Sequence, residues 1–143
     1  MAYENENILQ AGFITLVSIH AGDTKTAVGV AILAGLGIDP SAEAHNKVMN
    51  MAENGYGVLT NHRFVYSPDK AYKKLAAGQP FTLDDSTVKL SLMLTDFISI
   101  SQGKQGFSPL IIMETAAGTF KFAFMKKAVC DAWEAALHQA TGK

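Results

Sequence analysis

The most apolar run of the chain lies in residues 27–38, AVGVAILAGLGI, which include three glycines and no charged residue. The run is apolar on nearly all sides, so it predicts a helix over about residues 24–34 that is buried in the fold or against a partner. A membrane-spanning helix needs roughly 20 consecutive apolar residues, and this run of twelve is too short. Small side chains would let a second backbone approach this helix closely, which makes four residues candidates for self-association: Ala27, Gly29, Ala31 and Ala34.

The segments on either side of this run carry different patterns. Residues 39–55, DPSAEAHNKVMNMAENG, begin with Asp-Pro and end with Asn-Gly, which predicts a second helix. Residues 8–19, ILQAGFITLVSI, are rich in β-branched residues and fit either an early strand or an apolar helix. The two predicted helices together form a helical insertion over residues 24–54.

From residue 56 onward the pattern is typical of β-structure. Residues 56–67, YGVLTNHRFVYS, alternate and are rich in Val, Phe and Tyr, and Ser-Pro-Asp breaks the pattern at its end. Residues 68–78, PDKAYKKLAAG, predict a short helix or helical turn that Gly78 closes. Residues 86–101, STVKLSLMLTDFISIS, fit a strand by alternation and also a helix by their apolar face.

The last third of the chain predicts a hairpin and one amphipathic helix. The segments PLIIMET (residues 109–115) and TFKFAFM (residues 119–125) flank the turn AAG, and the three phenylalanines of the second segment share one strand face. Residues 126–140, KKAVCDAWEAALHQA, follow as a helix. Its predicted inward residues are Val129, Trp133, Ala136 and Leu137.

The charge and the reactive side chains of the sequence argue against nucleic-acid binding, metal binding and catalysis. The net charge is −1 and Arg63 is the single arginine, whereas nucleic-acid binding demands a clustered basic face. Cys130 is the single cysteine and is interpreted as a packing residue of the last helix. The four histidines are isolated in sequence, and the pair Asp84-Asp85 is more simply a cap than a metal or acid–base site. We therefore expect no catalytic residue, no metal site, no cofactor and no nucleic-acid partner.

Two further features bear on location and on lipid binding. The first ten residues, MAYENENILQ, lack the positive charge that opens a secretory signal, so we expect a cytoplasmic protein. Lys70, Lys73 and Lys74 form a small basic group that suggests binding to an anionic lipid head group. Three lysines are fewer than the four to eight that such binding normally needs, so a solvated helix face is the simpler interpretation.

The order of strands, hairpin and terminal helix resembles a pleckstrin-homology-like domain. Residues 57–67, GVLTNHRFVYS, are similar to the Thr-Asn-x-Arg strand of GRAM and bacterial pleckstrin-homology-like domains. Residues 94–137, LTDFISISQGKQGFSPLIIMETAAGTFKFAFMKKAVCDAWEAAL, resemble the strand, hairpin and capping helix that follow. The resemblance covers about residues 56–139, and it implies that the ambiguous segment near residues 88–100 is mostly strand.

The resemblance implies an α+β fold: a partly open β-barrel capped by a carboxyl-terminal amphipathic helix, with Trp133 and Leu137 as the plug. In that fold Thr60, Asn61 and Arg63 belong to a turn between paired strands, and Arg63 anchors nearby backbone or carboxylate groups rather than a ligand. We expect residues 1–143 to form a single domain, with the helices of residues 24–54 as a departure from the family. The implied function is a non-catalytic module that binds a protein partner, including itself, and the alternative is a peripheral lipid-binding domain.

Overall fold

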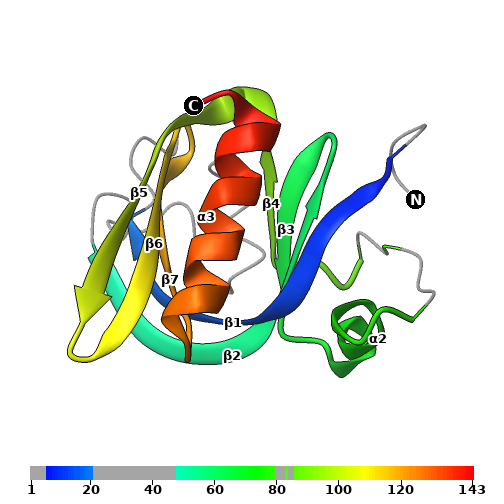
Figure 1. Cartoon of the computed structure of the whole chain (residues 1–143), viewed down its shortest axis with the longest axis horizontal. Helices are drawn as coiled ribbons and strands as arrows, with labels where there is room; N and C mark the ends of the chain where they lie inside the picture. The colour runs from blue at the N-terminus through cyan, green and yellow to red at the C-terminus, as the bar shows by residue number, and fades with distance from the viewer. Residues whose placement is uncertain (1–5, 21–47, 80–82, 84–85) are drawn as a thin grey trace.

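The computed structural model describes residues 6–20, 48–79, 83 and 86–143. Strands make up most of this part of the chain, and a single long helix ends it (Figure 1). The elements in chain order are β1 (Ile8–His20), β2 (Val48–Thr60), β3 (Arg63–Ser67), the 3₁₀ helix η1 (Lys70–Tyr72), α2 (Lys73–Ala76), β4 (Leu90–Met93), the 3₁₀ helix η2 (Leu94–Asp96), β5 (Phe97–Gln105), β6 (Ser108–Thr115), β7 (Gly118–Ala123) and α3 (Lys127–Thr141).

The strands form one antiparallel sheet in the order β4-β3-β2-β1-β7-β6-β5. β1 links the two halves of the sheet. The whole length of β1 pairs with β2, and the second half of β1, from Thr15 onward, also pairs with β7. β1 and β2 curve beneath α3, so that β3 and β4 lie on one side of the helix and β5 to β7 on the other (Figure 1). The sheet is not closed, and the structure confirms the predicted partly open barrel with its terminal helix.

Trp133 of α3 packs into the curved sheet over a pair of glycines. Gly12 of β1 and Gly57 of β2 are register partners. A Cβ atom at Gly57 would lie 3.3 Å from Trp133 Cη2 and 2.6 Å from Ile14 Cδ1, and one at Gly12 would lie 3.5 Å from Trp133 Nε1. A side chain at Gly57 would therefore collide with Ile14 and crowd the indole, whereas a Cβ atom at Gly12 would make an ordinary contact with it. Phe64 meets the same indole edge-to-face, with ring centroids 6.0 Å apart.

The main core fills the concave side of the sheet beneath α3. The three phenylalanines of the last hairpin, Phe120, Phe122 and Phe124, are all buried on this side, as their shared face predicts. From α3 the buried residues are Cys130, Trp133 and Leu137. Val129, which we expected to face inward, is instead 41% exposed, because the helix turns Cys130 toward the sheet in its first turn.

A smaller apolar cluster covers the outer face of β2 and β3. Tyr72 of η1 is fully buried there against Val58, Val65 and Leu83, and Leu75 of α2 packs beside them. This contact explains why the short helical segment predicted before Gly78 forms, since the four-residue helix α2 has too few backbone hydrogen bonds to be stable alone. Its position places the lysines of η1 and α2 on the outside of the molecule.

The structure corrects the predicted helical insertion. Residues 48–54 belong to β2, where their backbones pair with the second half of β1, instead of ending a helix. Sheet pairing along both edges of β1 outweighs the local helix pattern, as tertiary context commonly does. Residues 8–19, for which the sequence left two possibilities, are strand β1. The helix predicted over residues 24–34, with Ala27, Gly29, Ala31 and Ala34, lies outside the described residues.

The ambiguous segment after residue 86 is mostly strand. β4 and β5 are separated by η2, so the alternation of this segment is interrupted for three residues. β5 continues to Gln105 and β6 begins at Ser108, so a two-residue turn joins them. Gly106 takes a left-handed φ of 61°, which favours glycine at this point of the hairpin.

We predict that Trp133→Ala lowers the free energy of unfolding by about 3–5 kcal/mol, because it leaves a large cavity over the glycine pair. The matched control on the same helix is Val129→Ala, which should change stability by about 0.5 kcal/mol or less because its side chain is partly exposed. Urea unfolding followed by circular dichroism measures both. Equal losses in the two variants would show that Trp133 does not hold the helix on the sheet.

Candidate functional site

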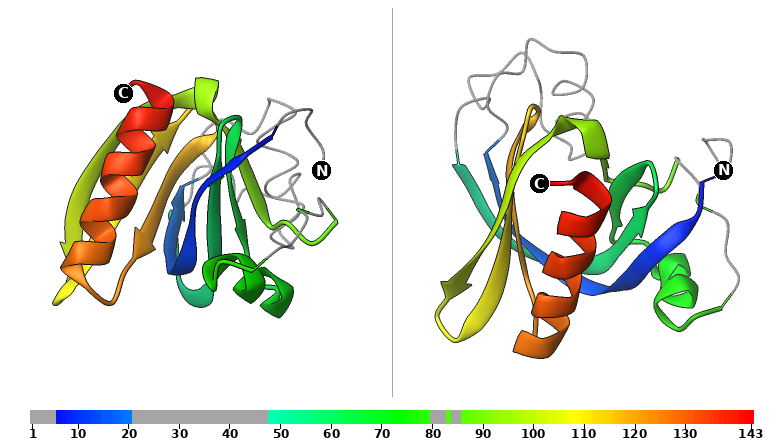
Figure 2. Two further views of the ribbon diagram at one scale, coloured as in Figure 1. Left: turned by 45° about the vertical axis from the view of Figure 1, so that its right-hand side comes forward. Right: turned by 45° about the horizontal axis from the view of Figure 1, so that its top comes forward.

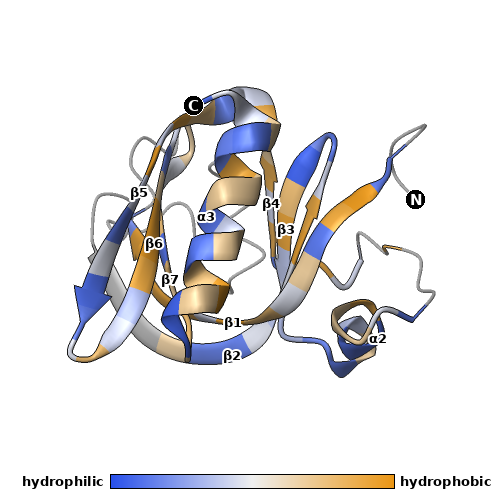
Figure 3. Cartoon of the chain, in the orientation of Figure 1, coloured by the Kyte–Doolittle hydropathy of each residue, from blue (hydrophilic) through white to orange (hydrophobic). Residues whose placement is uncertain are grey.

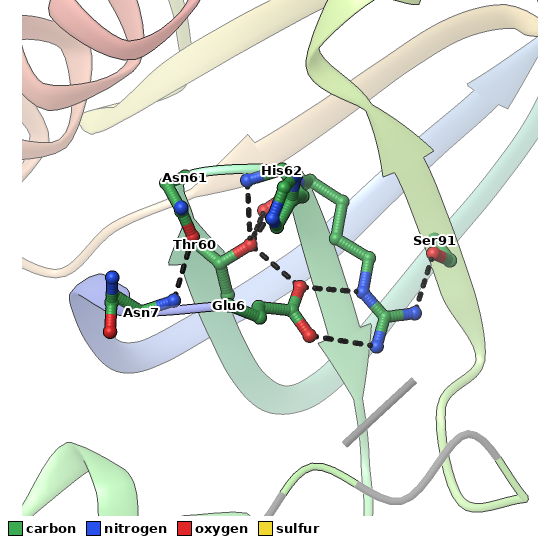
Figure 4. A network of polar contacts seen from close by, with 7 residues as sticks. Glu6, Asn7, Thr60, Asn61, His62 and Ser91 are labelled. Carbon is green, nitrogen blue, oxygen red and sulfur yellow. Dashed lines mark hydrogen bonds and ion pairs between the residues drawn. The ribbon is translucent and has the colours of Figure 1, made fainter. Parts of the chain in front are cut away.

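The Thr-Asn-x-Arg segment lies at the hairpin between β2 and β3, and its arginine is buried. Arg63 and Glu6 are 2% and 3% exposed. Arg63 Nε donates to Glu6 Oε2 at 3.0 Å, Nη2 donates to Glu6 Oε1 at 3.4 Å, and Nη1 donates to Ser91 Oγ at 3.1 Å (Figure 4). All three guanidinium nitrogens are therefore engaged inside the protein, which connects β3 to β4 and to the segment before β1.

Thr60 and Asn61 complete this polar lock, which we define as Glu6, Asn7, Thr60, Asn61 and Arg63. The Thr60 hydroxyl accepts from the backbone N–H of Arg63 at 3.0 Å and lies 2.7 Å from Glu6 Oε2, to which it donates. The Asn61 side chain accepts from the backbone N–H of Asn7 at 2.6 Å, and the Asn61 N–H donates to the Asn7 carbonyl at 3.1 Å. Each motif side chain thus makes a hydrogen bond with a polar group of the turn or of the amino-terminal segment (Figure 4).

In this geometry the motif side chains bind other groups of the fold. A buried arginine whose carboxylate partner is equally buried contributes little to a ligand site, because releasing it would leave a desolvated charge behind. The anchoring of a nearby carboxylate by Arg63 agrees with the structural interpretation of the motif. The sequence offered no signal that this carboxylate is Glu6, which lies 57 residues away along the chain.

A second polar cluster joins β2, β3 and the residue that precedes β4. Tyr66 donates to Glu53 Oε1 at 3.0 Å, and Lys89 Nζ lies 2.6 Å from Glu53 Oε2. Burial, followed by the hydrogen bond to Glu53 and its charge, raises the pKa of Tyr66 well above its ordinary value. The phenol therefore stays protonated and acts as a hydrogen-bond donor.

The third polar cluster fixes α3 to β5. Gln102 of β5 donates to Asp131 Oδ1 at 2.8 Å and to Glu134 Oε1 at 2.7 Å, while Lys127 donates to Gln102 and Asp131. Hydrogen bonds from Lys127 and Gln102 lower the pKa of Asp131. Burial raises the pKa of the neighbouring Cys130 thiol, so Cys130 is a packing residue with little thiolate.

The lysines proposed for lipid binding lie together and exposed. Lys70 belongs to η1, and Lys73 and Lys74 form the first turn of α2. No ion pair to any of the three occurs among the described residues. These two short helices lie on the outside of the molecule, and α2 is at the opposite end from the β5–β6 turn in every view (Figures 1 and 2).

An apolar tip that the sequence analysis missed lies at the β5–β6 turn and the segment before α3. Phe107 in the β5–β6 turn is 104% exposed and Met125, just before α3, is 87% exposed. The Phe124 N–H donates to the Pro109 carbonyl at 3.0 Å, so the backbones of these two segments lie side by side. Lys104 and Lys126 are exposed beside it. A phenylalanine within a glycine-bearing turn was the available signal, since turns ordinarily carry polar residues.

Other candidate chemistry is not assembled in the part of the chain that the structure describes. Within it, no three His, Cys, Asp or Glu side chains come together as a metal site would need. Asp84 and Asp85 lie outside the described residues. No helix among the described residues has the length and apolarity to cross a membrane.

Comparisons with known proteins identify the fold. No protein-family model matches the sequence, and no curated protein matches it. The structure is similar to the pleckstrin homology domain of ArhGAP27, with a TM-score of 0.55 and 12% identity over 92% of this chain and 97% of that domain. It is also similar to the truncated linker-DH/PH domains of p115-RhoGEF, with a TM-score of 0.52 and 9% identity over 96% of this chain and 30% of that longer chain.

These likenesses show that the chain has a pleckstrin homology fold, as the resemblance of residues 56–139 implied. At such low identity they bear on the fold alone. They do not extend to the GRAM or bacterial groups within the resemblance. The ligand has to be argued from the surfaces of this chain.

We predict that Arg63→Ala lowers the free energy of unfolding by about 3–5 kcal/mol, because it leaves the Glu6 carboxylate buried without its cation. The matched control is Lys89→Ala, which breaks the more exposed pair with Glu53 and should cost about 1 kcal/mol or less. Thermal and urea unfolding measure the two losses. Similar values for both variants would contradict the role of the polar lock.

Proposed function

We propose that this chain is a non-catalytic binding module whose ligand is a protein, including a second copy of itself. The observation that supports the proposal is that the described part of the fold leaves large apolar side chains exposed, since apolar surface marks an interaction site where such side chains adjoin. These residues are Ile8, Leu9, Phe13, Ile98, Phe107, Met125 and Val129.

The polar groups of the described residues support the same proposal. Every fully buried side-chain nitrogen or oxygen there has a hydrogen-bond partner, so none is aimed unsatisfied into a site. The three polar clusters connect elements of the fold to each other. A pleckstrin homology fold with its polar groups committed in this way suits recognition by surface contacts better than chemistry.

A second candidate ligand is an anionic membrane surface, and the apolar tip is the observation that favours it. Phe107 and Met125 would enter the interface while Lys104 and Lys126 meet acidic head groups. α2, which carries Lys73 and Lys74, lies at the opposite end of the molecule from the β5–β6 turn (Figure 2), so these lysines form a separate basic group. Either candidate suits the cytoplasmic location expected from the sequence.

We predict that the purified chain forms a homo-oligomer at tens of micromolar, as measured by sedimentation velocity. The small residues proposed for the contact were Ala27, Gly29, Ala31 and Ala34, so Gly29→Leu should weaken association by blocking close approach while the barrel stays folded. The control variant is Ala76→Leu on α2, which adds comparable bulk at an exposed site. Gly78→Leu is unsuitable as a control, because Gly78 has a φ of 76° that a leucine rarely adopts. A monomer at all concentrations would end the self-association proposal.

We predict for the membrane candidate that the chain co-sediments with vesicles of phosphatidylserine and phosphatidylcholine, and that added salt releases it, because salt screens lysine–head-group attraction. The paired change Phe107→Ser and Met125→Ser should reduce retention. Equal retention on vesicles of phosphatidylcholine alone, or none on either, would leave protein binding as the function.

A further inference from the structure

The outer face of the sheet, opposite α3, carries an aromatic pair. Successive side chains of a strand point to opposite faces, and Ile14 and Leu16 of β1 lie in the core beneath α3. Phe13 therefore points to the outer face, where it is 43% exposed. Its register partner Tyr56 of β2 meets it edge-to-face, with ring centroids 6.0 Å apart. Tyr56 also packs against the smaller apolar cluster, so this pair adjoins the segment of η1 and α2.

The register of β1 with β7 leads from Phe13 to the apolar tip. Thr15 of β1 pairs antiparallel with Ala123 of β7. Phe13 lies two residues before Thr15, and Met125 lies two residues after Ala123. Continuing the register by two residues therefore brings Phe13 and Met125 to the same level. The exposed apolar side chains follow one another from the middle of β1 to Phe107 in the β5–β6 turn.

Two basic groups flank these apolar side chains. Lys104 and Lys126 are exposed beside the tip, and Lys70, Lys73 and Lys74 are exposed on η1 and α2. No ion pair to any of the five occurs within the part of the chain that the structure describes. The β5–β6 turn, the start of α3, the curve of β1 and β2, and α2 follow one another along the lower side of Figure 1. The two basic groups thus lie at the two ends of one face.

We infer that this lower face docks flat on an anionic membrane surface, which rests on the membrane candidate of the proposed function and extends it beyond the apolar tip. Phe107 and Met125 enter the interface at one end, and Phe13 contacts it near the centre. Both basic groups then meet acidic head groups. The lower face is defined by Phe13, Lys70, Lys73, Lys74, Lys104, Phe107, Met125 and Lys126.

Charge complementarity favours this ligand. Binding to anionic lipid normally needs four to eight basic residues. Neither basic group reaches that number alone, whereas the five lysines of the lower face do. The acidic residues nearest to them in sequence are Asp69 beside Lys70, and Asp131, which already pairs with Lys127. The lower face therefore keeps an excess of positive charge at both ends.

The shape of the apolar tip also favours a membrane over a protein at this face. Phe107 and Met125 are almost wholly exposed on a turn and on the segment before α3. The centre of a protein interface is packed against a surface of matching shape. A lipid interface accepts protruding apolar side chains without such a match, and lysines beside them add attraction to the head groups.

Paired lysine variants test whether both ends of the lower face touch the membrane. Lys73→Gln with Lys74→Gln, and Lys104→Gln with Lys126→Gln, should each weaken binding to vesicles of phosphatidylserine and phosphatidylcholine by about 25-fold, at about 5-fold per lysine. The control is Lys143→Gln, because this exposed lysine follows α3 at the opposite side of the molecule (Figure 1). It should bind as the unchanged chain does. Co-sedimentation at low salt measures each affinity.

Variants of Phe13 test the centre of the lower face. Phe13→Ser should weaken vesicle binding, and Phe13→Leu, which keeps an apolar side chain, should retain most of it. The matched control is Ile98→Ser, which removes a side chain that is 56% exposed at the end of β5 away from the turn, and which should leave binding unchanged. Circular dichroism verifies that each variant is folded. The lysine variants change exposed side chains only, so they decide the inference even if Phe13→Ser does not fold.

The outcomes separate this inference from the function on which it rests. Weaker binding of both lysine pairs, with Lys143→Gln unchanged, supports flat docking. If the Lys73 and Lys74 variant binds as tightly as the unchanged chain, flat docking is wrong, and membrane binding by the tip alone remains. If the unchanged chain does not bind these vesicles, the membrane candidate and the inference are both wrong, and a protein remains as the ligand.

Discussion

Trp133 determines how the helix and the sheet fit together. Its indole lies over Gly12 and Gly57, and a Cβ atom at Gly57 would crowd the ring and collide with the neighbouring Ile14. β1 and β2 pass beneath α3 and lead to β7 on one side of the core and to β3 on the other (Figure 1). The phenylalanines of β3 and β7 then close around the same ring system.

The polar lock holds the other end of this arrangement. The first half of β1 pairs with β2 alone, so its start depends on the contacts of Glu6 and Asn7 with the β2–β3 hairpin. Arg63 also reaches Ser91 of β4. The Thr-Asn-x-Arg motif is thereby explained by folding: it joins the amino-terminal segment, a hairpin and an edge strand by buried hydrogen bonds.

For function, the interior and the surface of the described residues differ. The polar side chains of the three clusters bind one another and so connect elements of the fold. The described residues present outward the lysines of η1 and α2 and the apolar tip at Phe107 and Met125. These surfaces differ in charge, so the salt dependence of binding distinguishes their contributions.

The sequence by itself determined the hairpin of β6 and β7 and the amphipathic helix α3, and the family resemblance implied the turn between paired strands at Thr60 and Arg63. In these elements local periodicity and burial agree, and the family resemblance supplied their order. Tertiary structure alone decided that residues 48–54 are strand, because pairing with β1 outweighs a local helix pattern. It likewise decided that Glu6 is the partner of Arg63 and that Phe107 and Met125 share a tip, since these contacts join segments whose separation no local pattern encodes.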